Sequence, residues 1–151
     1  MDNEDKIQHC RKNKWIEAWF AMEALGTKKE IVETSLKDHI SKMQRYPDIF
    51  IYETDYKETE NVDKDKLSLP EEMKEKIDEA WSQVVEIRLF VKKFSSLINM
   101  IYLFGPSAIE ILGPDSKELK IDEIQDIANT LAGLMHQFAS AGVGGIIITP
   151  K

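Results

Sequence analysis

The chain has 151 residues, which fits a single domain, because one hydrophobic core is usually built from about 100–150 residues. Its hydrophobic fraction of 42% and charged fraction of 31% predict an ordinary core beneath a highly charged surface and argue against disorder throughout. The net charge of −7 repels phosphate backbones and anionic lipids, so we expect no nucleic-acid partner and no membrane partner.

The N-terminal segment and the cysteine content predict the compartment. Residues 1–14 mix acidic and basic side chains and lack the apolar stretch of a signal peptide. The longest mainly apolar run, residues 97–112, is shorter than the roughly 20 residues of a membrane span. The single cysteine, Cys10, cannot form an internal disulfide, which favours a reducing compartment. We therefore expect a cytoplasmic protein with a flexible segment at residues 1–14.

A first strand–helix–strand unit is predicted from residue 15 onward. Residues 15–25 alternate between apolar and polar side chains, which is the period of a half-buried strand. Gly26 ends this strand, and Thr27 and Glu30 have the spacing of a capping box, so a helix is expected to begin there. Residues 49–56 are rich in aromatic and β-branched side chains and predict a second strand.

A second unit of the same kind follows. Residues 83–91 alternate again, residues 94–104 have helical spacing and end at Gly105-Pro106, and residues 107–112 predict a fourth strand. The order β-α-β-β-α-β is the ferredoxin-like plan. The predicted fold class is therefore α+β, a ferredoxin-like sandwich in which two helices cover one face of an antiparallel four-stranded sheet with its first and third strands central.

Two further segments extend this plan. Residues 53–79 contain eleven acidic and five basic side chains, so residues 57–79 are predicted to form a solvated linker or inserted arm that ends in a short helix. Residues 121–140 carry one apolar stripe and predict an additional C-terminal helix. We therefore expect a single domain at residues 15–140, followed by an apolar tail or edge strand at residues 141–151.

No segment has a catalytic or metal-binding signature. His9, His39 and His136 are widely separated, and none has a second His or Cys at ligand spacing, so no metal site is expected. The glycines at 142–145 follow a helix instead of opening one, which favours a turn over a phosphate site. We expect no catalytic residue and no cofactor, and an enzyme without a recognisable motif stays an alternative.

The strongest candidate for a functional surface is the sheet face turned away from the two predicted helices. Strand alternation places Trp15 and Trp19 there from the first strand and Phe90 from the third. Aromatic side chains at cross-strand distance, bordered by Glu86 and Arg88, are typical of an interface core with a polar rim. Three explanations compete: the C-terminal helix folds across this face, the chain oligomerises, or a ligand binds there. The acidic neighbours argue against RNA as that ligand.

The apolar tail supplies the other candidate contacts. Ile146 and Ile148 lie in a β-branched run that has no partner within the predicted four-stranded sheet. The predicted binding or interface residues are therefore Trp15, Trp19, Glu86, Arg88, Phe90, Ile146 and Ile148.

Two stretches of the second half resemble a small family of uncharacterised archaeal proteins. They are Phe-Gly-Pro-Ser-Ala-Ile-Glu-Ile at residues 104–111 and Glu-Ile-Gln-Asp-Ile-Ala-Asn at residues 123–129. The resemblance covers roughly the second half of the chain, with the whole domain as the alternative extent, and it implies no reaction, cofactor or catalytic residue.

These patterns favour a cytoplasmic binding or assembly module that self-associates through its open sheet face or its C-terminal strand. The alternative is a small-molecule-sensing regulatory domain of the ACT-like kind, by analogy of fold, with its ligand at a subunit boundary. An enzyme is less favoured and would need a pocket in which a histidine or carboxylate meets Arg88.

Overall fold

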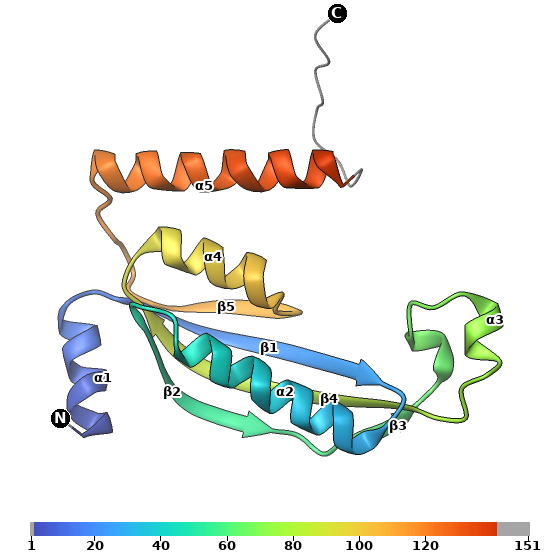
Figure 1. The fold of residues 1–151 in the computed structure, drawn as a ribbon. Helices are drawn as coiled ribbons and strands as arrows, with labels where there is room; N and C mark the ends of the chain where they lie inside the picture. Colours follow the sequence, from blue (N-terminus) through green and yellow to red (C-terminus); the bar gives the residue numbers. More distant parts are fainter. Residues whose placement is uncertain (1, 142–151) are drawn as a thin grey trace, which may run out of the picture.

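The computed structural model describes residues 2–141 and has an α+β fold with an open five-stranded antiparallel sheet (Figure 1). These residues form five α-helices and one 3-10 turn in addition to the strands. In chain order the elements are α1 (Asn3–Lys12), β1 (Ile16–Gly26), α2 (Lys29–Gln44), β2 (Ile49–Tyr56), β3 (Glu60–Val62), η1 (Lys64–Lys66), α3 (Glu71–Lys74), β4 (Ala80–Val91), α4 (Phe94–Phe104), β5 (Ala108–Gly113) and α5 (Ile121–Ser140).

The strand order is β2-β4-β1-β5, so β1 and β4 are the central strands, as the sequence predicts. Every neighbouring pair runs antiparallel, and the short β3 pairs with the beginning of β4. The four long strands and the three long helices predicted from the sequence are confirmed. The segment between β2 and β4, predicted as an arm with a short helix, contains β3, η1 and α3 and projects from one end of the sheet (Figure 1).

The core lies between the sheet and the two helices α2 and α4. Alternate residues of β1 and β4 point into it, because successive side chains of a strand face opposite sides. The buried strand residues of this core are Ile16, Ala18, Phe20, Met22, Ile51, Val85, Ile87, Leu89 and Val91. The helices contribute Leu36, Ile40 and Met43 from α2 and Leu97, Met100 and Phe104 from α4. Each large side chain buried here stabilises the fold by about 1.5–3 kcal/mol before the entropy cost of ordering it.

The start of α2 differs from the predicted capping box. Lys28 is the N-cap residue, and within the described residues its side chain makes no hydrogen bond to the helix. Because the helix begins one residue later than the box requires, Glu30 occupies the second helical position and the reciprocal bonds with Thr27 do not form. Gly26 ends β1 beside the helix: a Cβ atom placed there would lie 2.8 Å from Cγ2 of Val32. The close approach of strand and helix therefore requires glycine at this position.

Helix α1 occupies the segment that was expected to be flexible. Asp2 caps the helix by accepting a hydrogen bond from the backbone N–H of Asp5 at 2.8 Å. The helix has little apolar surface of its own: Cys10 is buried and Ile7 is half-buried, while most other positions are charged or polar. A prediction based on apolar periodicity therefore found no helix there.

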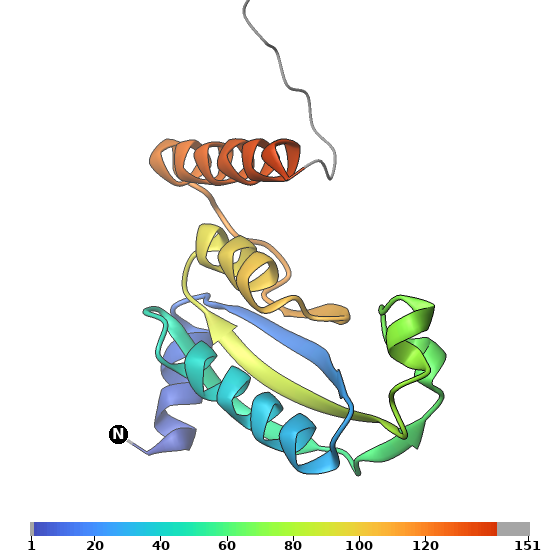
Figure 2. The ribbon, with the colours of Figure 1, turned by 45° about the vertical axis from the view of Figure 1, so that its right-hand side comes forward.

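Helix α5 lies over α4, on the side of the molecule away from the sheet (Figures 1 and 2). One of the three explanations for the aromatic residues on the opposite sheet face is that the C-terminal helix folds across it. The position of α5 over α4 rules this explanation out. Among the described residues, α1 covers one part of that face, and Trp19 and Arg88 lie on a part that remains at least partly exposed.

Candidate interaction surface

The outer face, which is the sheet face turned away from α2 and α4, is centred on Trp19. In the strand register Trp19 lies opposite Arg88 on β4 and Glu110 on β5, between side chains of opposite charge. Arg88 Nε lies 3.6 Å from Glu53 Oε2, and these two side chains are 46% and 60% exposed. Ion pairs this exposed contribute about 1 kcal/mol or less. The centre of the outer face is thus an open, mostly polar surface with one half-buried tryptophan.

Glu86 belongs to a second charged group on the outer face. Lys57 Nζ lies 2.8 Å from a Glu86 carboxylate oxygen and 2.5 Å from one of Asp55. The hydrogen bonds to Asp55 and to Glu86 raise the pKa of Lys57 above its ordinary value. Lys57 therefore stays a cation and neutralises part of the acidic charge next to Glu86.

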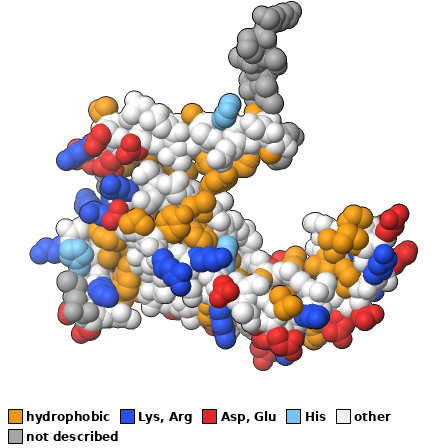
Figure 3. Space-filling view, viewed as in Figure 1, with side chains coloured by type: hydrophobic (Ala, Val, Ile, Leu, Met, Phe, Trp, Pro, Cys, Tyr) orange, Lys and Arg blue, Asp and Glu red, His pale blue; other side chains and the backbone are white. Residues whose placement is uncertain are grey.

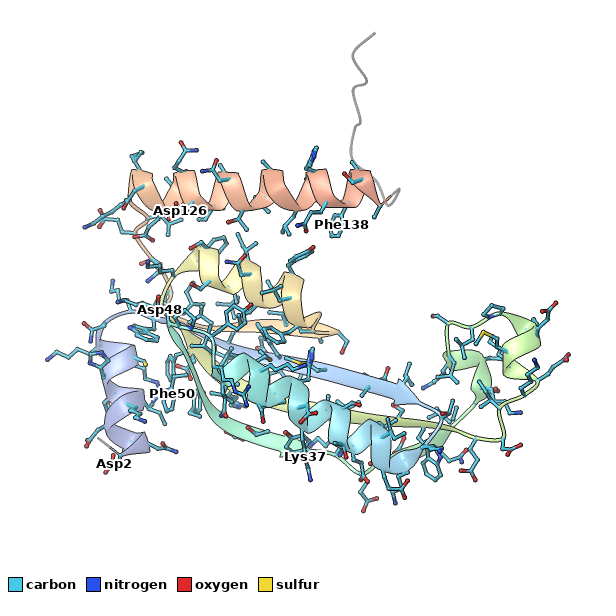
Figure 4. The ribbon with its side chains drawn as sticks, viewed as in Figure 1. Asp2, Lys37, Asp48, Phe50, Asp126 and Phe138 are labelled. Carbon is cyan, nitrogen blue, oxygen red and sulfur yellow. The ribbon has the colours of Figure 1, made fainter. Side chains whose placement is uncertain are left out.

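Phe90 is fully buried and is not part of the open outer face. Its ring stacks on Phe50 with a centroid distance of 6.4 Å and an interplanar angle of 10°, and it lies 5.1 Å from the ring of Tyr52. Helix α1 covers this aromatic group: Lys6 lies over Phe50, which is labelled in Figure 4, and Arg11 lies over Phe90. Phe90 is therefore the centre of a small second core under α1.

Glu17 on β1 holds α1 against the sheet by accepting hydrogen bonds from Arg11, next to this aromatic group. Arg11 donates two hydrogen bonds of 3.1 Å to its carboxylate, and the Tyr52 hydroxyl donates a third of 2.6 Å. The Arg11 hydrogen bond is the main reason that the pKa of Glu17 is lowered, although partial burial opposes it. Burial, followed by the bond to Glu17, raises the pKa of Tyr52. The cluster thus holds one carboxylate ionised and one phenol neutral.

The predicted surface residues are therefore divided between two environments. Trp19, Glu86 and Arg88 share the open part of the outer face. Trp15 is half-buried in the turn between α1 and β1, where its ring meets His9 edge to face at 6.4 Å. Phe90 is buried under α1. The last two predicted contacts, Ile146 and Ile148, lie outside the described residues.

A second surface carries more exposed apolar side chains than the outer face does. We call it the α4–β5–α5 surface, after the three elements that form it. Large side chains of each element remain between 37% and 80% exposed. They are Phe94, Ile101, Tyr102 and Leu103 on α4, Ile109, Ile111 and Leu112 on β5, and Ile121, Ile124, Leu131 and Met135 on α5. Figure 3 shows hydrophobic side chains gathered on the flank where α5 faces α4.

The contact between α4 and α5 is incomplete. A cavity of about 490 Å³ lies between them and is lined by Ile98, Ile101, Tyr102, Leu131, Leu134 and Phe138. Phe138, labelled in Figure 4, points from α5 toward α4, and its ring lies 6.0 Å from that of Tyr102. The Tyr102 hydroxyl donates a hydrogen bond to Gln137. This cavity opens to the surface, so apolar side chains of both helices stay partly uncovered along it.

Strand β5 forms one edge of the sheet. Ile109 and Ile111 pair with the buried residues Phe20 and Ala18 of β1, which places them on the helix-covered face. They nevertheless remain 39% and 52% exposed. A cavity of about 250 Å³ adjoins this edge and is lined by Ile16, Phe94, Leu97, Ile111, Pro114, Lys117 and Leu119.

Charge on the α4–β5–α5 surface is confined to Glu110 on β5 and to Asp122, Glu123 and Asp126 at the start of α5. No Asp, Glu, Lys or Arg occurs in residues 94–104, which form α4, or in residues 127–141 of α5 and its end, although 31% of the whole chain is charged. These uncharged stretches are visible in the sequence and could have indicated this surface. A prediction from strand and helix periodicity does not take charge into account. Interface cores are depleted of charged residues in the same way.

Within the described residues, the histidines belong to no metal-binding cluster and the helices include no membrane span. The ring Nε2 of His39 lies 2.8 Å from the carbonyl oxygen of Phe104, where it caps the end of α4. Within residues 2–141, no three His, Cys, Asp or Glu side chains lie close enough together to bind a metal ion. No helix in that range has the length and apolar character needed to cross a membrane.

Comparison with known proteins agrees with the resemblance seen in residues 104–129. The model of the MJ0538 family matches residues 17–147, a range that includes all the strands apart from Ile16, the first residue of β1, and four of the five described helices. The suspected relationship to a small archaeal family is thereby confirmed. No curated protein and no solved structure matches the chain.

Proposed function

We propose that this chain, which belongs to the MJ0538 family, is an assembly module that self-associates through the α4–β5–α5 surface. The observation that carries the proposal is the apolar stripe of α5. Of its twenty residues, Ala139 is the one that is fully buried, while Leu131 and Met135 stay 45% and 48% exposed. A helix with a strong apolar stripe is stable when that stripe is covered, so the stripe favours a partner.

The free energy gained by burying these exposed apolar side chains supports this proposal. Fully burying a Leu, Ile or Met side chain is favourable by about 1.5–3 kcal/mol. Covering the exposed half of several such residues on α4, β5 and α5 at once gives several kcal/mol toward association, before the entropy cost of bringing two chains together. Monomeric proteins rarely expose contiguous apolar patches larger than a few hundred Å².

Charge favours a second copy of the chain as the partner. Two chains of net charge −7 repel each other, so association is easier through a surface that contributes little of that charge. The α4–β5–α5 surface meets this condition, whereas the outer face carries Glu53, Glu86 and Glu110. The self-association surface that we propose is therefore the helical flank and not the outer face.

We also propose that the domain follows the ferredoxin-like plan. The order β2-β4-β1-β5, with α2 between β1 and β2 and α4 between β4 and β5, supports this assignment. The cytoplasm remains the proposed compartment, since Cys10 is a buried free thiol.

Replacement of Leu131 tests the proposed surface. Leu131→Lys places a charge in the stripe, and we expect the variant to be a monomer in light scattering coupled to size exclusion, with unchanged helix content by circular dichroism. The matched control is Asn129→Lys, an exposed position two residues away on the other side of α5, which should remain an oligomer. An oligomer in both variants would contradict the proposal.

A small-molecule sensor is the second candidate, because the cavity of about 250 Å³ lies next to the β5 edge. Its lining is apolar apart from Lys117, whose ammonium donates a hydrogen bond of 2.7 Å to the carbonyl oxygen of Lys14. Such a cavity suits a small apolar molecule. Native mass spectrometry on gently purified protein checks this reading, and a retained non-protein mass lost in Ile111→Trp would support it.

A further inference from the structure

We infer that two copies of the chain join edge to edge along β5, antiparallel, with Ile109 of one copy opposite Ile109 of the other. This inference rests on the proposed self-association and adds its geometry. The two sheets would become one continuous sheet, and the α4–β5–α5 surfaces of both copies would meet at the two-fold axis.

The free edge of β5 is available for pairing. Among residues 2–141, β5 pairs with β1 and with no other strand, so the groups on its second edge have no strand partner. Sheet edges usually carry lysine, proline, several charges or a bulge that prevent such pairing. Within Ala108–Ile111 the one charged residue is Glu110, and Ala108 to Ile111 pair regularly with β1.

The opposite edge of the sheet provides a contrast. Strand β2 carries Glu53 and Asp55, and its pairing with β4 is interrupted by a register shift between Ile51 and Glu53. Lys57 follows immediately after its end. These are features that protect an edge strand. Strand β5 has one charge, Glu110, and an irregularity at Leu112, so its regular part, Ala108–Ile111, is less protected than β2.

The register follows from the side chains of β5. Antiparallel pairing about a two-fold axis puts residues of the same face opposite each other, which leaves Ile109, Glu110 or Ile111 as the central residue. Centring on Glu110 would place two carboxylates directly opposite, which is destabilising. Centring on Ile111 would require the irregular residues 112 and 113 to pair. Centring on Ile109 uses the regular segment alone and places Ala108 opposite Glu110 of the other copy.

The same axis brings the helical layers together. A two-fold axis perpendicular to the sheet keeps α4 and α5 of both copies on the same face of the joined sheet. Ile109 and Ile111 of each copy then lie diagonally across the joint, where their exposed parts cover one another. The partner is a second copy because the strand and the flanking uncharged helices form one self-complementary patch.

Cysteine cross-linking of the full-length chain tests the register. Paired residues of antiparallel strands have Cα atoms about 4.5–5.5 Å apart, within disulfide range. In the proposed register Ile109→Cys should therefore form a covalent dimer under mild oxidation. Glu110→Cys should not, because its equivalent in the other copy is displaced by two residues, about 8 Å away. A mixture of Ala108→Cys and Glu110→Cys chains should give the mixed dimer.

The native thiol provides the background control. Cys10 is 3% exposed, and burial raises its pKa, so the unmodified chain should stay uncross-linked under the same oxidation. Light scattering on each variant before oxidation separates the two proposals. A non-covalent dimer in which Ile109→Cys fails to cross-link would overturn the β5 joint and leave self-association standing. A monomer before oxidation would overturn both.

Discussion

Arg11 on α1 donates two hydrogen bonds of 3.1 Å to the carboxylate of Glu17 on β1. The bond from Tyr52 completes the group, and the Glu17 side chain is 13% exposed. This contact explains how a short, polar helix stays in place over the sheet, and it predicts how the stability of the protein changes with pH.

Glu17→Gln should lower the free energy of unfolding at pH 7 by about 1 kcal/mol, because the charge-assisted bonds are lost and Arg11 is half exposed to solvent. The folded state lowers the pKa of Glu17 below its ordinary value of 4.5. Its carboxylate therefore stabilises the fold above about pH 4.5, and this contribution is lost as the pH falls through the lower folded pKa.

Urea unfolding of the wild type and of Glu17→Gln between pH 7 and pH 3 measures this contribution. The two stabilities should converge as the pH falls below 4.5. Glu53→Gln is the control, since its ion pair with Arg88 is long and exposed and should contribute little. A difference between the wild type and Glu17→Gln that is the same at pH 7 and pH 3 would contradict the assignment.

Phe90 and Trp19 should respond differently to truncation. Phe90→Ala removes a fully buried ring from the aromatic group under α1 and should cost about 3–5 kcal/mol of stability. Trp19→Ala, on the open part of the outer face, should cost less and leave the oligomeric state unchanged. Thermal unfolding and light scattering measure both effects. If Trp19→Ala dissociates the oligomer while stability is unchanged, the interface lies on the outer face and not on the α4–β5–α5 surface.

Two glycines should respond to alanine with opposite signs. At Gly26 the added Cβ would lie 2.8 Å from Val32, so Gly26→Ala should destabilise the protein by about 1–3 kcal/mol. At Gly133, in the middle of α5, a Cβ meets no described atom within 4 Å. Gly133→Ala should therefore stabilise the helix by about 0.5–1 kcal/mol. Chemical denaturation of the two variants side by side tests the close packing at Gly26, and equal effects would disprove it.

Removal of residues 142–151 tests the predicted contacts of Ile146 and Ile148. If the α4–β5–α5 surface carries self-association, a chain ending at Ala141 keeps the oligomeric state of the full chain. Loss of association on truncation, with α5 still helical, would instead assign the interface to the C-terminal segment. Sedimentation velocity of the two chains at equal concentration distinguishes these outcomes.

Much of the fold could be predicted from the sequence because each long element repeats one period over many residues. The alternation in β1 and β4 identified the central strands, and the stripe in α5 identified the longest helix. Helix α1 could not be found in this way, because Arg11 and Lys6 hold it through charge and ring contacts. A period of apolar residues carries no information about such contacts.

The environments of the candidate interface residues were harder to predict, for a different reason. Strand alternation correctly placed Trp19 and Arg88 on one face, but it could not show that Phe90 lies beneath α1. Nor could it show that α5 packs on α4 with a cavity between them, since that depends on the path of the chain after β5. The absence of charge from α4 was visible in the sequence and gains its meaning from this arrangement.

The most direct test of the central claim is the mass of the wild-type protein in solution, measured by sedimentation equilibrium over a range of micromolar concentrations. Self-association through the α4–β5–α5 surface predicts a species of twice the chain mass of 17.4 kDa, which reverts to the chain mass in Leu131→Lys. A wild-type protein that remains at 17.4 kDa throughout this range would contradict the account.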